Sequence, residues 1–84
     1  MIEARAVIPH FISGPLHGVR VPQALWDRDV ILARGFGYDV LYVRTLFYRP
    51  PEHGGSFPFF CVRGESTDST TAQVVYLLQR GLLC

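Results

Sequence analysis

Arginines and aromatic residues alternate between residues 42 and 63, and they form the first group that could do chemistry. Arg44, Arg49 and Arg63 interleave with Tyr42, Tyr48 and Phe59. An aromatic ring can hold a base by stacking, and a guanidinium can hold a phosphate through forked hydrogen bonds. The three arginines with Tyr42 and Tyr48 are therefore a candidate ligand site of the kind that suits a nucleotide. The alternative is that they are strand-end arginines stacked on neighbouring rings without a ligand.

The three histidines form a second group, at positions 10, 17 and 53. His17 lies between Gly14 and Gly18, and His53 lies next to Gly54. Both therefore occupy turns, where function is often found. Both are added to the candidate ligand site, and the alternative for each is a solvated loop histidine. Their spacing matches no zinc signature and no cysteine pair accompanies them, so we expect no metal site and no cofactor.

Catalytic groups are scarce. Cys61 and a histidine would make a nucleophile–base pair on paper. However, Cys61 is flanked by Phe59, Phe60 and Val62, and apolar surroundings disfavour the reactive thiolate. The seven carboxylates include no pair placed for acid–base work. We therefore expect no catalytic residues and a protein that is not an enzyme, with a small enzyme using His17 or His53 as an alternative.

The composition predicts one small domain, residues 1–84, with more apolar surface than it can bury. Hydrophobic residues make up 49% of the chain and charged residues only 18%. Because small domains have a large surface for their volume, this composition leaves apolar patches exposed. Self-association into a dimer or larger assembly would cover the excess. The net charge of +1 argues against duplex nucleic acid as a partner.

The cellular location is predicted from what the sequence lacks. The first residues include an acid and lead into no long apolar core, so we expect no signal peptide. No apolar run approaches the length of a membrane span. Two cysteines, Cys61 and Cys84, do not make a disulfide framework. These features favour a soluble intracellular protein without membrane contact.

Turn signals and alternating apolar residues predict the strands that position these side chains. We expect strands at Ile2–Ile12, Leu16–Val21, Val30–Ala33, Tyr38–Arg49 and Phe57–Arg63, with one helical turn from Pro22 to Trp26. The fold class is α+β: a small antiparallel sheet of about five strands, with one C-terminal helix packed on one face.

The helix has start and stop signals. Thr67, Asp68 and Ser69 are good N-cap residues. Thr70 with Gln73 fits a capping box, and Gly81 stands where a helix ends. Helical spacing then predicts a packing stripe of Ala72, Val75, Leu78 and Leu82.

Tyr38–Arg49 indicates how the sheet is covered, because both of its faces are apolar. Val40, Tyr42 and Leu46 point one way, and Leu41, Val43 and Phe47 point the other, since side chains alternate across a strand. Five strands make a sheet roughly 20 Å wide, whereas one helix is about 10 Å across. The helix therefore covers one face only in part, and another copy or a partner must cover the rest.

The order of these elements resembles that of small proteins encoded by phages and prophages, many of which have no assigned function. The likeness rests on the turn Gly14-Pro15-Leu16-His17-Gly18, the Tyr- and Arg-rich strand, the Gly54-Gly55 turn and the short C-terminal helix. It departs at His17, where an acidic residue is the more usual. The resemblance implies a viral protein in the host cytoplasm that acts by binding, and it carries over no catalytic residue.

These arguments together predict a binding protein that self-associates and inhibits or sequesters a host protein or a signalling nucleotide. The resemblance leaves one alternative, a structural or connector subunit of the virion. The histidines leave the other, the small enzyme described above.

Overall fold

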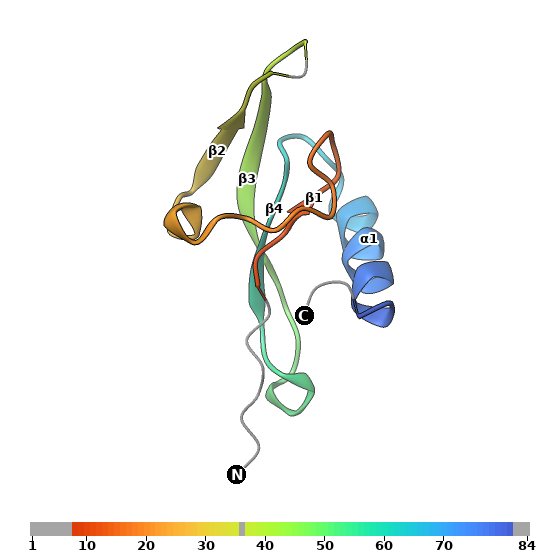
Figure 1. Ribbon diagram of the computed structural model, residues 1–84. Coiled ribbons are helices and arrows are strands. Elements are labelled where there is room, and N and C mark those ends of the chain that lie inside the picture. The colour runs from red at the N-terminus through yellow and green to blue at the C-terminus, as the bar shows by residue number, and fades with distance from the viewer. Residues whose placement is uncertain (1–7, 36, 82–84) are drawn as a thin grey trace.

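The computed structural model describes residues 8–35 and 37–81, which form one sheet and one long helix (Figure 1). Within these residues the strands are β1 (Phe11–Ile12), β2 (Val30–Ala33), β3 (Val40–Phe47) and β4 (Phe57–Val62), and the helices are the 3₁₀ turns η1 (Gln23–Leu25) and η2 (Pro51–His53) and the α-helix α1 (Thr67–Gln79). The predicted α+β class is confirmed.

The four strands of the described chain lie in the order β1-β4-β3-β2. β3 is antiparallel to both of its neighbours, but β1 runs parallel to β4, so the sheet is mixed. The predicted third strand has the same bounds as β2. Of the predicted first strand only Phe11–Ile12 is a strand, and residues 2–7 lie outside the described residues.

Of the predicted strand Leu16–Val21, residues 16–18 form a turn, and Arg20 makes only an isolated antiparallel bridge with His10. Gly14 and Gly18 have φ of 68° and 83°, a left-handed backbone that interrupts an extended chain. Val19 N–H then donates to the Leu16 carbonyl within the turn, while Phe11 N–H donates to the Val19 carbonyl. This segment therefore folds back beside β1 without becoming a fifth strand.

The sheet has an apolar core on each face, because β4 places alternate side chains into both. The helix-side core consists of Ile12, Phe57, Phe59, Cys61, Val74 and Leu77. The loop-side core consists of Phe11, Val21, Ala33, Val40, Tyr42 and Phe60, with Leu16, Leu25 and Trp26 packed against it. The prediction that the long strand is apolar on both faces is confirmed. Its loop side is covered by residues 13–28, which we call the covering segment.

The helix begins one residue earlier than the predicted caps allow. Ser66 is the N-cap, and its Oγ accepts a hydrogen bond from Ser69 N–H at 3.1 Å. The predicted capping box of Thr70 with Gln73 is wrong, because Thr70 is buried and its hydroxyl donates to the Ser66 carbonyl. The helix does end before Gly81, whose φ is 69°, as is common where glycine follows a helix.

The packing stripe of α1 also differs from the prediction. Val74 and Leu77 are the apolar residues that α1 buries, and Leu78 packs at their edge. Ala72 and Val75 are exposed, so the predicted stripe is wrong at these two positions; Leu82 lies outside the described residues. Several apolar residues of α1 are close together in the sequence, and their spacing alone does not determine which of them face the sheet.

The Tyr42 hydroxyl fastens the covering segment to the sheet. Tyr42 is fully buried, donates to the Ser13 carbonyl at 2.9 Å and accepts from Leu16 N–H at 3.0 Å. Its ring packs edge-on against Phe11, with centroids 4.8 Å apart. A side chain at Gly14 would collide with this hydroxyl, since an added Cβ would lie 2.7 Å from it. The close approach of this turn to the Tyr42 hydroxyl therefore requires glycine at position 14.

Replacing Tyr42 with Phe should destabilise the fold by about 1–3 kcal/mol, because the buried Ser13 carbonyl and the partly buried Leu16 N–H lose their partner. Urea denaturation at a fixed protein concentration measures the change. Tyr48→Phe is the matched control, since Tyr48 is 79% exposed. This surface substitution should change stability by less than about 0.5 kcal/mol. Equal effects of the two substitutions would contradict the fastening role of Tyr42.

Candidate binding surface

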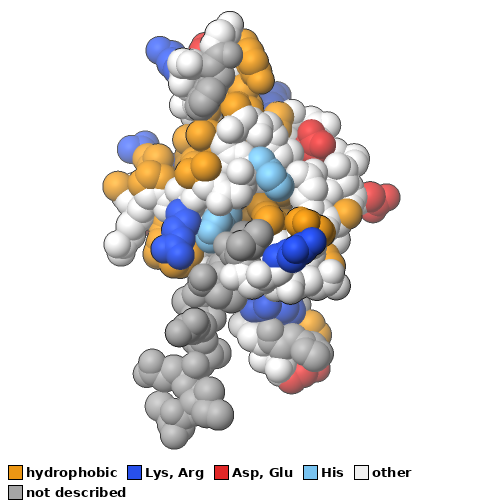
Figure 2. Space-filling model, turned by 45° about the vertical axis from the view of Figure 1, so that its right-hand side comes forward, with side chains coloured by type: hydrophobic (Ala, Val, Ile, Leu, Met, Phe, Trp, Pro, Cys, Tyr) orange, Lys and Arg blue, Asp and Glu red, His pale blue; other side chains and the backbone are white. Residues whose placement is uncertain are grey.

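Part of the helix side of the sheet is uncovered within the described residues. α1 packs over β4 and β1, beside which it lies in Figure 1, and leaves β2 and the neighbouring part of β3 open. Val30 and Leu32 are 50% and 46% exposed, and their β3 partners Val43 and Leu41 are half-buried. We call these four residues the open face. Figure 2 shows hydrophobic side chains, coloured orange, at several places on the molecular surface.

The backbone beside the open face is also unpaired, as the register of β3 shows. Arg63 N–H donates to the Leu41 carbonyl, so the odd-numbered residues of β3 bond to β4. The even-numbered residues bond toward β2, as Arg44 N–H does to the Asp29 carbonyl. The same alternation turns the N–H and C=O groups of Val30 and Leu32 to the outer edge of β2, which is the edge of the described sheet.

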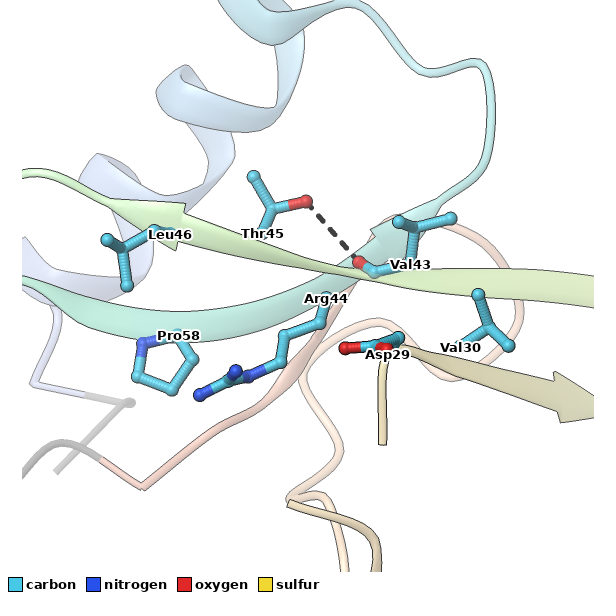
Figure 3. Close-up of a pocket in the computed structure, with 7 residues that line it drawn as sticks. All are labelled: Asp29, Val30, Val43, Arg44, Thr45, Leu46 and Pro58. Carbon is cyan, nitrogen blue, oxygen red and sulfur yellow. Dashed lines mark hydrogen bonds between the residues drawn. The ribbon is translucent and has the colours of Figure 1, made fainter. Parts of the chain in front are cut away.

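A pocket of about 350 Å³ lies beside the start of β2, where β3 extends past it. It is lined by Asp29, Val30, Val43, Arg44, Thr45, Leu46 and Pro58 (Figure 3). We call it the edge notch. Figure 3 shows Arg44 and Pro58 on one side of β3 and Val43 and Thr45 on the other. The backbone of Leu46 faces this notch, because residue 46 follows the even-numbered pattern. The notch thus offers backbone groups, apolar side chains and two exposed residues of opposite charge, Arg44 and Asp29.

The predicted ligand residues do not gather in one place. Arg44 is exposed at the edge notch, whereas Arg63 is exposed in the turn after β4. The Arg49 Nε–H donates to the Gly55 carbonyl at 3.0 Å, and its guanidinium lies 5.0 Å above the Phe57 ring. Tyr42 is buried and presents no surface to a ligand. Tyr48 is exposed near a different hollow.

Of the two histidines of the predicted site, His17 is bonded within its own turn. His17 Nδ1 accepts a hydrogen bond from Ser13 N–H at 2.8 Å, which makes this ring part of the turn at residues 13–18. His53 is the last residue of η2, and its side chain lies outside what the structure describes.

Cys61 lines a second hollow, of about 440 Å³, between β3, β4 and the start of α1. Its thiol and the Thr45 hydroxyl are 3.3 Å apart and share a hydrogen bond. No histidine is among the described residues that line this hollow. Within the described chain no three His, Cys, Asp or Glu side chains are grouped so that they could hold a metal ion. Within the described chain, Cys61 is thus surrounded by packed apolar side chains and by the Thr45 hydroxyl.

His10 is a functional group whose environment the sequence did not reveal. It is 3% exposed, and its Nδ1–H donates to the Ile8 carbonyl at 2.6 Å. Burial lowers the pKa of His10 below its usual 6.5; the bond to Ile8 opposes this, and the charge of Arg20 adds to the lowering, since both burial and a like charge disfavour the imidazolium. The backbone of His10 pairs with that of Arg20 across the turn. A predicted pairing of these two residues is the only signal that could have indicated that His10 is buried.

The lowered pKa makes the stability of the fold depend on pH. The unfolded chain takes up a proton at His10 near pH 6.5 while the folded chain still resists it, so protonation favours the unfolded state. The free energy of unfolding should therefore be constant above that pH and decrease as the pH falls from there toward the folded pKa. Denaturation of wild type and His10→Gln between pH 8 and pH 5 measures this, and an equally steep loss in both would contradict it.

Comparisons with protein-family models, with curated proteins and with solved structures give no match to this chain. No helix in the described part of the chain has the length and apolar character needed to cross a bilayer. The candidate surface is therefore interpreted from its own geometry.

Proposed function

We propose that this protein acts by binding: it self-associates and inhibits or sequesters a host protein. The observation that carries the proposal is the open face beside the outer edge of β2. There, half-exposed apolar side chains and outward-facing backbone groups belong to the same two residues, Val30 and Leu32. Another polypeptide strand satisfies both kinds of group at once.

The scattered basic residues favour a protein over a nucleotide as the partner. A nucleotide site needs arginines that converge on the phosphates. Arg44 and Arg63 lie at different places, and the Arg49 Nε–H is already bonded within the chain. The open face and the edge notch instead match the apolar centre and polar rim of a protein interface. The role against a host factor is the one that the resemblance to phage proteins implies.

The energy available from such a surface is large compared with the stability of a small domain. Burying roughly 500 Å² of apolar surface contributes about 12 kcal/mol at about 25 cal/mol per Å². Association costs about 4–15 kcal/mol in lost freedom. A contact of this size is therefore at the threshold of stable association, where single substitutions on the open face change the outcome.

The mass of the purified protein in solution tests the proposal. We expect light scattering at micromolar concentration to give a multiple of the 9.5 kDa chain mass. Val30→Lys should shift the mass toward the single chain, because a charge on the open face must lose its water on association. A wild-type protein of 9.5 kDa at these concentrations would overturn self-association.

Val75→Lys is the matched control, since Val75 is also exposed but lies on α1. We expect it to leave the mass unchanged. A host protein held through the open face should be retained by wild-type and Val75→Lys protein and lost by Val30→Lys. Equal retention by all three would contradict the open face as the binding surface.

A further inference from the structure

We propose that the edge notch is a binding site for a small zwitterion, an α-amino acid with an apolar side chain. The inference goes beyond the proposed function, because a single chain can hold such a ligand whether or not it associates. The notch has a volume of about 350 Å³, which is near the lower end of the range for ligand pockets, roughly 300–1,000 Å³. Its size therefore suits a small molecule.

The notch presents one negative and one positive side chain on the same face of the sheet. Arg44 N–H donates to the Asp29 carbonyl, which continues the β2–β3 register by one residue pair beyond Val30 and Val43. Residues directly opposite each other on two strands point to the same face. Figure 3 accordingly shows the Asp29 and Arg44 side chains on one side of β3, together with Pro58.

These two charges do not pair with each other, although opposite charges across two strands attract. Figure 3 shows the Arg44 guanidinium turned toward Pro58 and away from Asp29. Among the residues that the structure describes, neither side chain has a hydrogen-bond or ion-pair partner. A ligand in the notch therefore meets a carboxylate on one side and a guanidinium on the other.

This arrangement of charges selects the class of ligand. A purely anionic ligand is repelled by Asp29, and a purely cationic ligand is repelled by Arg44. A molecule that carries both an ammonium and a carboxylate is attracted by both residues, and each of its charged groups can form a charge-assisted hydrogen bond. The terminus of a polypeptide carries only one of these groups. A free α-amino acid carries both, a short distance apart, and so fits the notch better.

Backbone and apolar groups complete the site. Leu46 is the single even-numbered residue of β3 beyond Arg44, and its backbone faces the notch. Its N–H can donate to the ligand carboxylate, and its carbonyl can accept from the ammonium. Val30 and Val43 line the notch from the other face of the sheet, where they can contact an apolar ligand side chain. The notch thus matches one amino acid rather than a row of them.

Titration with L-leucine tests the ligand class. We expect millimolar leucine to change the NMR chemical shifts of the Arg44 and Leu46 amides. N-acetyl-leucine lacks the ammonium and leucine amide lacks the carboxylate, so each should bind at least about tenfold more weakly than leucine, because one charge-assisted hydrogen bond is lost. Equal binding of leucine and either derivative would overturn the inference, as would the absence of any leucine-dependent shift.

Two substitutions test the residues. Arg44→Gln and Asp29→Asn should each weaken leucine binding at least about tenfold, and circular dichroism should show both variants folded, because both side chains are exposed. Glu52→Gln and Arg80→Gln remove exposed charges elsewhere and should leave leucine binding unchanged. Wild-type affinity in either notch variant would contradict the site. A monomeric protein that binds leucine would contradict self-association alone, whereas an oligomer that does not bind leucine would contradict this inference alone.

Discussion

The structure depends on one constraint: its central strands are apolar on both faces, so each face needs a cover. Phe59 and Phe60 are neighbours in β4 and enter opposite cores, and both are almost completely buried. α1 supplies one cover and the covering segment supplies the other. Neither reaches the helix side of β2. The open face is the apolar part of the sheet that neither α1 nor the covering segment contacts within the described chain.

The covering segment replaces the second helix that a larger domain would use. A loop carries many backbone polar groups, and burying them is costly unless each finds a partner. Tyr42 resolves this conflict from within the core, because one hydroxyl serves both Ser13 and Leu16. Trp26 contributes in the same way, since its indole N–H donates to the Val21 carbonyl at 2.7 Å. The loop side is thus covered with the help of aromatic side chains that pack in the core and also donate hydrogen bonds to backbone carbonyls.

The sequence predicted the parts of the fold in which one local signal dominates. β2 has its predicted bounds, and β3 and β4 show the predicted alternation, because period-two patterns between turn residues are strong. The turn at residues 14–18 was misjudged, since two glycines with positive φ allowed a backbone that its apolar residues did not indicate. The helix stripe was misjudged because Val74 and Val75 have the same local propensity. Their separation depends on the direction in which α1 meets the sheet.

The candidate site was less predictable than the fold, because residue type does not determine exposure. Tyr42 and Leu46 lie on the same face of β3, yet Tyr42 is 0% exposed and Leu46 is 43% exposed. The difference arises from where the covering segment ends, which is a tertiary property. For the same reason the arginines that alternate with aromatics in sequence do not converge in space. The expectation that another copy or a partner must cover the face away from the helix is wrong, because residues 13–28 of the same chain cover it. The apolar residues of the open face that stay exposed lie on the helix side.

The location of the open edge follows from the path of the chain. On the β1 side, Phe11 bonds to residues of its own turn: its N–H donates to the Val19 carbonyl and its carbonyl accepts from Gly18 N–H. That edge is closed by the segment that also covers the loop side. The described chain has no comparable segment beside β2, because residues 22–29 turn toward the loop-side core before the strand begins. Backbone groups exposed in a row select for another strand more strongly than for a small ligand, since only a polypeptide repeats donors and acceptors at that spacing. The proposed binding role therefore derives from topology, and the apolar composition would determine only how strong the binding is.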